Sequence, residues 1–270
     1  MVDLSAEQLD RYARHLILEG VGPEGQEAFL DASVLVVGAG GLGSPVLQYL
    51  SAAGVGSLTV ADGDVVERSN LQRQVIHGTA DVGRPKARSA REAIRELNPD
   101  ITVSARETAV GPDEATSLAA DHDVVVDCSD NFPTRFLLND ACQLTSTPLV
   151  HGAVYRFEGQ ALTVPATDSA PCYRCLFSEA PPPGTVPDCA ETGVLGAVPG
   201  LIGTVQAIET LKLLLGAGEA LAGRLLVVEA LGMAVEEVPV RADPECPACG
   251  EDSTLRTVQQ VTYEGDCAIQ

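Results

Sequence analysis

Hydrophobic positions along the first half of the chain alternate between short continuous apolar runs and longer stretches with helical spacing. Continuous runs of this kind are typical of strands that are buried on both faces, and the stretches between them repeat apolar residues every three or four positions. We expect strands at 34–37, 57–61, 101–105 and 124–127, and helices at 5–18, 44–53 and 85–97. This alternation of strands and helices predicts a parallel sheet covered by helices on both faces.

The pattern changes after Pro148, where short strands follow one another without helices between them. We expect these strands at 149–155, 160–164, 224–229 and 234–240, and they predict that the sheet continues with antiparallel members. Residues 165–192 contain six prolines and predict a long crossing loop, which an apolar helix at 197–215 follows.

The charge balance narrows the classes of partner. The chain of 270 residues has 17 basic and 38 acidic residues, for a net charge of −21. Such a surplus opposes direct attraction to nucleic acid or to an anionic membrane surface. It suits a high-salt cytoplasm, and an ordinary acidic enzyme is the alternative explanation of the composition. The longest uncharged apolar stretch, 193–208, carries a proline and four glycines, which argues against a membrane helix.

The N-terminal sequence and the cysteine content indicate the cellular compartment. No secretory signal pattern opens the sequence. The eight cysteines are therefore better explained as metal ligands and free thiols than as disulfides, and we expect a cytoplasmic protein.

A glycine turn, Gly-Ala-Gly-Gly-Leu-Gly, ends the first apolar run. Its glycines at 38, 40, 41 and 43 permit a tight turn, a close approach of the backbone to phosphate, and close packing of the following helix. Asp62 follows about 20 residues later at the end of the next strand, where a carboxylate can accept from ribose hydroxyls. The pattern predicts a nucleotide site in a Rossmann-like α/β fold, without separating NAD from ATP. A glycine turn without a ligand is the less favoured reading, because strand, helix and acid all occur where a nucleotide needs them.

Further polar residues favour ATP. The run Ser-Asn-Leu-Gln-Arg-Gln at 69–74 follows Asp62, Lys86 begins a predicted helix, and Asp130 follows the strand at 124–127. Cationic side chains stabilise a leaving pyrophosphate, and a carboxylate can hold Mg²⁺. Taken singly, Arg73 or Lys86 would be an ordinary surface charge. An NAD-dependent oxidoreductase is the alternative, since it shares the glycine turn but needs none of these residues.

Two C-x-x-C pairs, Cys172 with Cys175 and Cys246 with Cys249, offer four thiolates for a tetrahedral zinc site. A metal bound there would join the crossing loop to the C-terminal segment, which is a structural role. A catalytic metal is less favoured, because no open position or nearby base is evident, and two unrelated turns are the remaining alternative.

In this order and along nearly the whole chain, the motifs resemble the bacterial and archaeal ubiquitin-activating-enzyme-like family. The resemblance is carried by the glycine turn at 38–43, Asp62, the run at 69–74, Gly-Arg-Pro-Lys at 83–86, Ser-Asp-Asn at 129–131 and the paired cysteines. The family includes the adenylyltransferases that activate the molybdopterin and thiamin sulfur carriers. The acidic composition is similar to that of haloarchaeal members, which activate small archaeal modifier proteins.

The resemblance implies that ATP adenylates the C-terminal glycine of a small β-grasp protein ending in Gly-Gly, with release of pyrophosphate. The product would serve protein modification, or sulfur transfer to tRNA or molybdopterin. It implies ATP, Mg²⁺ and Zn²⁺ as cofactors and a homodimer as the assembly. No rhodanese-like domain follows the zinc pair, so we expect another protein to supply the sulfur.

Residue roles are also implied by the resemblance. Nucleotide contacts fall on Gly38, Gly40, Gly41, Gly43, Asp62, Ser69, Asn70, Leu71, Gln72, Arg73, Lys86, Asp130 and Asn131. Catalytic roles fall on Arg14, Arg73, Lys86, Asp130 and Cys189, with Asp130 holding Mg²⁺. Arg14 matches the N-terminal arginine that reaches the partner's site in a homodimer, although an exposed helix charge competes as an explanation. In that family a cysteine placed like Cys189 can form a thioester or take part in sulfur transfer.

The remaining thiols and the histidines give weaker signals. Cys128 and Cys142 are expected to be small core residues and Cys267 a free thiol, while His151 is expected to be a hydrogen-bonded core residue.

We expect one continuous adenylation domain in three parts: a helical segment at 1–30, a nucleotide-binding part at 31–164, and the loop, helix, antiparallel strands and zinc site at 165–270. A third hypothesis is a catalytically idle zinc scaffold that binds partners.

Overall fold

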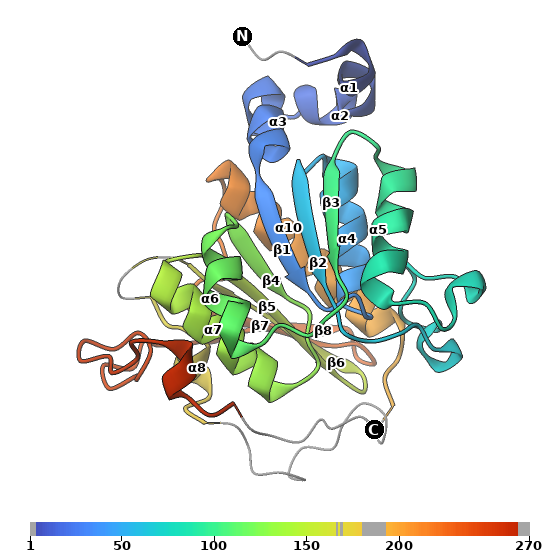
Figure 1. The fold of residues 1–270 in the computed structure, drawn as a ribbon. Coiled ribbons are helices and arrows are strands. Elements are labelled where there is room, and N and C mark those ends of the chain that lie inside the picture. Colours follow the sequence, from blue (N-terminus) through green and yellow to red (C-terminus); the bar gives the residue numbers. More distant parts are fainter. Residues whose placement is uncertain (1–3, 166, 168–169, 180–192, 264–270) are drawn as a thin grey trace.

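The fold is built on one sheet of eight strands in the order β3-β2-β1-β4-β5-β6-β7-β8 (Figure 1). The computed structural model describes residues 4–165, 167, 170–179 and 193–263. The strands are β1 Ser33–Val37, β2 Ser57–Ala61, β3 Thr102–Arg106, β4 Val124–Asp127, β5 Leu149–Tyr155, β6 Glu158–Val164, β7 Arg224–Glu229 and β8 Ala234–Pro239. The first five strands in this order, from β3 through β5, pair in parallel. The pairs β5–β6, β6–β7 and β7–β8 are antiparallel, as the sequence predicts.

The register of the central strands determines where the candidate site forms. Val37 at the end of β1 pairs with Ala61 of β2 on one side and with Asp127 of β4 on the other. Because the three strands run in parallel, the residues that follow them emerge at the same edge of the sheet. The glycine turn, Asp62 and the segment from Cys128 therefore begin side by side.

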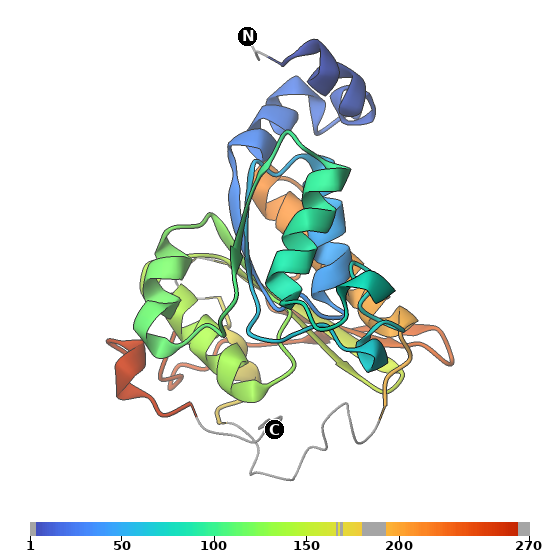
Figure 2. The same ribbon diagram turned by 45° about the vertical axis from the view of Figure 1, so that its right-hand side comes forward.

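Helices cover both faces of the parallel part of the sheet (Figures 1 and 2). The helices that the structure describes are α1 Ala6–Arg11, α2 Ala13–Leu16, α3 Gly22–Asp31, α4 Gly43–Ala53, α5 Lys86–Leu97, α6 Pro112–Ala120, α7 Phe132–Thr145, α8 Tyr173–Leu176 and α10 Ala197–Leu215, with 3-10 turns η1 Arg68–Asn70, η2 Thr79–Asp81 and η3 Val258–Gln260. Helices α4, α5 and α10 pack on one face, and α6 and α7 pack on the other. Alternate residues of β1 enter the two cores, Val34 and Val36 on the first face and Leu35 and Val37 on the second.

Three details differ from the sequence-based prediction. The helix expected at 5–18 is two short helices, because Tyr12 leaves helical geometry and packs its ring, 2% exposed, into the core against Gly54. The helical segment expected at 1–30 includes most of α3 but does not give its bounds, and the pattern gives no bounds for α6 or α7, which have proline in the first turn. The crossing loop includes the four-residue helix α8.

Helix α10 is long and apolar enough to cross a membrane by length and composition, with a mean hydropathy of 1.3. In the described structure it packs against β5, β6 and α4. Its buried acid, Glu209, accepts hydrogen bonds of 2.7 Å from Thr163 Oγ1 and from the Leu221 backbone N–H, and it pairs with Lys212. These contacts integrate α10 into the fold.

Two buried histidines are held neutral. His77 is 6% exposed, and its Nε2 lies 2.9 Å from the Ala39 carbonyl oxygen while its Nδ1 lies 2.8 Å from Ser89 Oγ. Since a carbonyl only accepts, Nε2 carries the proton and Ser89 donates to Nδ1. Burial lowers the pKa of His77, and burial likewise lowers the pKa of His151.

We expect His77 to make the folded state less stable in mild acid. The pKa of His77 is lowered in the folded state, so below about pH 6.5 the unfolded chain binds a proton at this residue more readily than the folded chain does. The free energy of unfolding therefore falls as the pH drops through this range. Urea unfolding at pH 7.5 and 5.5 should show a smaller loss of stability in His77→Gln than in the unmodified protein. The comparison between the two proteins removes the effect of net charge, and an identical pH dependence would contradict the assignment.

Candidate active site

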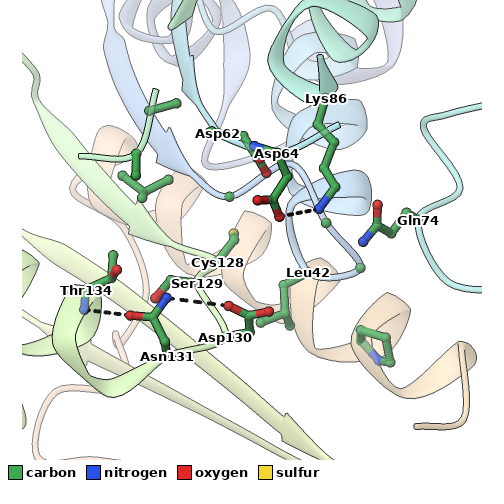
Figure 3. A pocket seen from close by; sticks show the side chains of 18 of the residues that line it. Leu42, Asp62, Asp64, Gln74, Lys86, Cys128, Ser129, Asp130, Asn131 and Thr134 are labelled. Atoms are coloured by element: carbon green, nitrogen blue, oxygen red, sulfur yellow. Dashed lines mark hydrogen bonds and ion pairs between the residues drawn. The ribbon is translucent and has the colours of Figure 1, made fainter. Parts of the chain in front are cut away.

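A cavity of about 330 Å³ opens at the carboxyl edge of β1, β2 and β4 (Figure 3). Of the residues predicted to bind nucleotide, those that line it are Gly38, Gly40, Gly41, Asp62, Arg73, Lys86, Asp130 and Asn131. Ala109 and Val110, which follow β3, add an apolar wall beside Asp62. These lining residues come from six separate parts of the sequence, which meet at one edge of the sheet.

The glycine turn has no room for side chains at two positions. Gly38 has φ +99°, and a Cβ there would lie 2.6 Å from the carbonyl oxygen of Cys128. A Cβ on Gly43 would lie 2.0 Å from the carbonyl oxygen of Gly38. Gly43 does not line the cavity, so its glycine is explained by packing at the start of α4. The turn leaves the N-terminus of this 11-residue helix next to the cavity, where backbone N–H groups favour an anion.

Asp62 supports the turn in addition to facing the cavity. Its Oδ2 accepts a 2.7 Å hydrogen bond from the Ala39 backbone N–H, and its Oδ1 accepts one of 2.8 Å from the N–H of Asp64. Burial raises the pKa of Asp62, and the positive charge of Lys86 opposes that rise. The carboxylate can therefore receive a ribose hydroxyl only through its remaining lone pairs.

Lys86 reaches the cavity from the first residue of α5. Its side chain is nearly buried, and its Nζ donates a 2.7 Å hydrogen bond to Oδ2 of Asp64, whose side chain is 62% exposed (Figure 3). Asp64 was not among the residues predicted from the sequence, although it stands two residues after Asp62. The ammonium is thus held in place by a solvent-exposed carboxylate, and it remains next to the space that a polyphosphate would fill.

Only part of the run at 69–74 lines the cavity, and other residues of the run support the backbone around it. Ser69, Asn70, Leu71 and Gln72 do not line the cavity. Asn70 is buried, and its Oδ1 accepts a 3.1 Å hydrogen bond from the Glu67 N–H. Arg73 lines the cavity and donates to the Ser69 carbonyl oxygen at 3.3 Å. The nucleotide contacts assigned to the first four residues stay predictions.

A buried hydrogen-bond network holds the segment after β4. Asp127 accepts from the Ser129 N–H at 3.0 Å and from His151 Nδ1 at 2.8 Å. Burial raises the pKa of Asp127, but the hydrogen bond from His151 and the positive charge of Arg135 keep it below its usual value. His151, 2% exposed, is the hydrogen-bonded core residue predicted from the sequence. The network leaves the next residue, Asp130, exposed in the cavity.

Helix α7 starts at the cavity. Asn131 caps it by accepting a 2.9 Å hydrogen bond from the Thr134 N–H. Arg135, which was not predicted from the sequence, also lines the cavity, and its guanidinium lies 5.1 Å from the centre of the Phe132 ring. Its position one helical turn after Asn131 is the signal that could have identified it.

Arg14 lies away from the cavity of its own chain. It is exposed on α2, and α1 to α3 stand at the opposite end of the parallel strands from the glycine turn (Figure 1).

The four paired cysteines come together between the crossing loop and the C-terminal segment. All four sulfur atoms lie within 4.8 Å of one another, with 3.7 Å between Cys172 and Cys246 and 3.3 Å between Cys175 and Cys249. Four thiolates bound to zinc at about 2.3 Å lie about 3.8 Å apart at the corners of a tetrahedron, so the donor set fits a zinc ion. A closed set of four sulfur ligands favours the structural role.

A buried ion pair joins the cysteine cluster to α7. Arg174, between two of the cysteines, donates to both oxygens of Asp140 at 2.7 and 2.6 Å, and the Tyr263 hydroxyl donates to the same carboxylate at 2.8 Å. Asn139 accepts a 2.9 Å hydrogen bond from the Tyr173 N–H. The same helix therefore carries residues of the cavity at its start and contacts with the cysteine cluster further along.

The other cysteines separate into two groups. Cys128 and Cys142 are buried, as predicted, and burial raises the pKa of each thiol above its usual range. Cys189 and Cys267 lie outside the described residues.

Comparison with known proteins identifies the family. The chain matches the ThiF family over residues 12–248. The chain belongs to the ThiF family. The SAMP-activating enzyme E1 of Haloferax volcanii is 58% identical over 268 residues, which make up 99% of this chain and 98% of that protein. The sulfur carrier protein adenylyltransferase of Thermus thermophilus is 51% identical over 98% of this chain and 98% of its own length. The mouse adenylyltransferase and sulfurtransferase MOCS3 is 49% identical over 98% of this chain and 57% of its own length.

A solved structure of Escherichia coli MccB with MccA-N7isoASN has the same fold as this ThiF-family chain. It matches with a TM-score of 0.79 at 20% identity, covering 93% of this chain and 76% of that one. The family recognised from the sequence motifs is thus confirmed, and so is the enzyme class, an adenylyltransferase.

We expect this ThiF-family protein to bind about one zinc ion per chain through the four cysteines. Replacing one ligand, in Cys246→Ser, should abolish retention of the metal and lower the melting temperature, because the segment that carries it loses its link to Cys172 and Cys175. Metal analysis of the purified protein and thermal unfolding measure both effects. Cys142→Ala, which removes a buried thiol outside the cluster, should keep the metal; a wild-type protein grown with zinc that holds none would contradict the assignment.

Proposed function

We propose that the protein uses MgATP to adenylate the C-terminal glycine of a small ubiquitin-like or sulfur-carrier protein that ends in Gly-Gly, with release of pyrophosphate. The observation that carries the proposal is that Arg73, Lys86 and Asp130 line one cavity beside the N-terminus of α4. Cations and a helix N-terminus suit a triphosphate, and an exposed carboxylate in the same cavity suits its metal ion.

The reaction requires a carboxylate to attack a phosphorus atom that is surrounded by negative charge. One oxygen of the glycine carboxylate forms the bond to the α-phosphorus, and the bond to the bridging oxygen of pyrophosphate breaks. Lys86 and Arg73 reduce the repulsion and stabilise the charge that develops on the leaving group. Mg²⁺, held by Asp130 with Asn131 beside it, would neutralise phosphate charge and keep the groups in line.

The modifier is the proposed partner because two of the relatives are named for such substrates, a SAMP and a sulfur carrier protein. The net charge of −21 disfavours nucleic acid as a direct partner, so transfer of sulfur to tRNA would proceed through the modifier. We further propose that another protein supplies the sulfur and that the enzyme acts in the cytoplasm, where thiolate ligands stay reduced.

Replacing Asp130 separates an enzyme from an inactive scaffold. In Asp130→Asn the metal ligand is weakened, and we expect exchange of labelled pyrophosphate into ATP, in the presence of a Gly-Gly modifier, to fall by about 10² to 10³. Asp113→Asn, which alters an exposed carboxylate in the first turn of α6, is the matched control and should keep full activity. Absence of any exchange in the wild-type protein with every candidate modifier would refute the proposal.

We also propose a homodimer that uses the exposed face of α4 and α10. This face carries Tyr49, Leu201 and Ile208, which are 53%, 41% and 52% exposed. Helix α4 has no charged residue, and the two charges of α10, Glu209 and Lys212, pair with each other. A surface without net charge allows two strongly acidic chains to approach, and exposed apolar side chains gain from burial.

Arg14 lies next to this face. His15, the residue after it, lines a groove of about 340 Å³ together with Tyr49 and Ile208. A second copy that docks on the groove would therefore bring its own Arg14 close to the first chain, and the arginine would complete the partner's cavity. This supports the role in the partner's site over that of a solvated helix charge.

Mixed dimers test this arrangement. Arg14→Ala and Asp130→Asn should each be inactive alone, since every site then lacks one of the two residues. When the two variants are exchanged into mixed dimers, one site in each mixed dimer recovers both, so pyrophosphate exchange should rise to about a quarter of the wild-type level. Equal activity before and after mixing, with dimer exchange verified, would show that Arg14 does not act across the interface.

A further inference from the structure

One buried side chain in the cavity has no hydrogen-bond partner in the described structure. Gln74 is 4% exposed, lines the cavity, and makes no side-chain hydrogen bond to any described residue. Its Oε1 is completely shielded from solvent. Leaving a buried amide unpaired costs free energy, so this position needs an explanation.

The fold satisfies its other buried carboxamides. Gln26 donates to the Ala53 carbonyl oxygen at 2.9 Å and accepts from His15 Nδ1 at the same distance. Gln206 donates to the carbonyl oxygen of Asp127 at 2.7 Å. Gln74 is therefore an exception among these buried glutamines, and it is the one that faces a cavity.

The backbone around Gln74 is fixed, so its side chain is presented in a defined place. Its N–H donates to the Asn70 carbonyl oxygen at 3.0 Å, and its own carbonyl accepts from the His77 N–H at 3.1 Å. A Cβ on Gly40 would lie 3.4 Å from Gln74 Nε2. Figure 3 shows the side chain beside the glycine turn, on the same side of the cavity as Lys86.

We propose that the carboxamide of Gln74 binds the phosphate groups of the nucleotide by donating a hydrogen bond from Nε2 next to Gly40. The inference rests on the proposed function, and it adds a binding residue to the six-residue run, beyond the positions assigned to it from the sequence. Phosphate oxygens only accept, and a carboxamide always offers an NH₂ group in one of its two orientations. Ala109 and Val110 form an apolar wall next to Asp62, and in this proposal the base and sugar occupy that part of the cavity.

The test is Gln74→Met, which keeps the length of the side chain and removes the amide. Affinity for MgATP should weaken by roughly tenfold to a hundredfold, as expected for one hydrogen bond to a charged group, while affinity for adenosine should stay the same. Because no hydrogen bond is lost in the free protein, its melting temperature without ligand should be unchanged or higher. Calorimetric titration, competition by adenosine and thermal unfolding provide these readouts.

Gln26→Met is the matched control, since it removes a buried amide that has two partners. It should lower the melting temperature and leave the affinity for MgATP unchanged. The inference is overturned if Gln74→Met binds MgATP as well as the wild type, or if it is less stable and loses affinity for MgATP and adenosine equally. A wild-type chain that binds adenosine but shows no preference for MgATP would overturn the proposed function as well.

Discussion

The parallel register of β1, β2 and β4 is the constraint on which the candidate site depends. Val37, Ala61 and Asp127 are paired at the same level, so the glycine turn, Asp62 and the segment leading to Asp130 leave the sheet together. A shift of one strand by one residue would separate these groups and reverse which side chains enter each core. Packing of alternate β1 residues into the two cores opposes such a shift, and the geometry of the cavity thus follows from the hydrophobic core.

Hydrogen bonds within the chain organise the cavity. Asp62 holds Ala39, His77 holds the same residue from the other side, and Asp127 holds Ser129. Groups that are oriented before the substrate binds need little reorganisation when charge moves, which is the main electrostatic advantage of an active site over water. Gln74 departs from this pattern, because its amide is oriented but unpaired.

Helix α7 connects the cavity with the cysteine cluster. Asn131 and Arg135 lie at its start, while Asn139 and Asp140 further along hold Tyr173 and Arg174 of the cluster. An ion pair buried this deeply is costly to break, since the remaining charge would be unpaired. The position of the helix start, and with it the residues beside Asp130, therefore depends in part on the segment that a zinc ion would hold.

The sequence alone determined the elements that short-range physics controls. Apolar runs predicted all eight strands to within about two residues, and the spacing of glycines, acids and paired cysteines indicated the nucleotide turn and a four-thiol cluster. Helix α6 was missed and the bounds of α3 were not predicted, because glycine and proline weaken the local signal.

Only the tertiary structure decided which residues of each motif face the cavity. Gly43 and Asn70 support the turn and its neighbours, whereas Asp64, Gln74 and Arg135 line the cavity. The distinction depends on burial and on long-range hydrogen bonds between segments far apart in the sequence, and a linear pattern carries no record of these contacts.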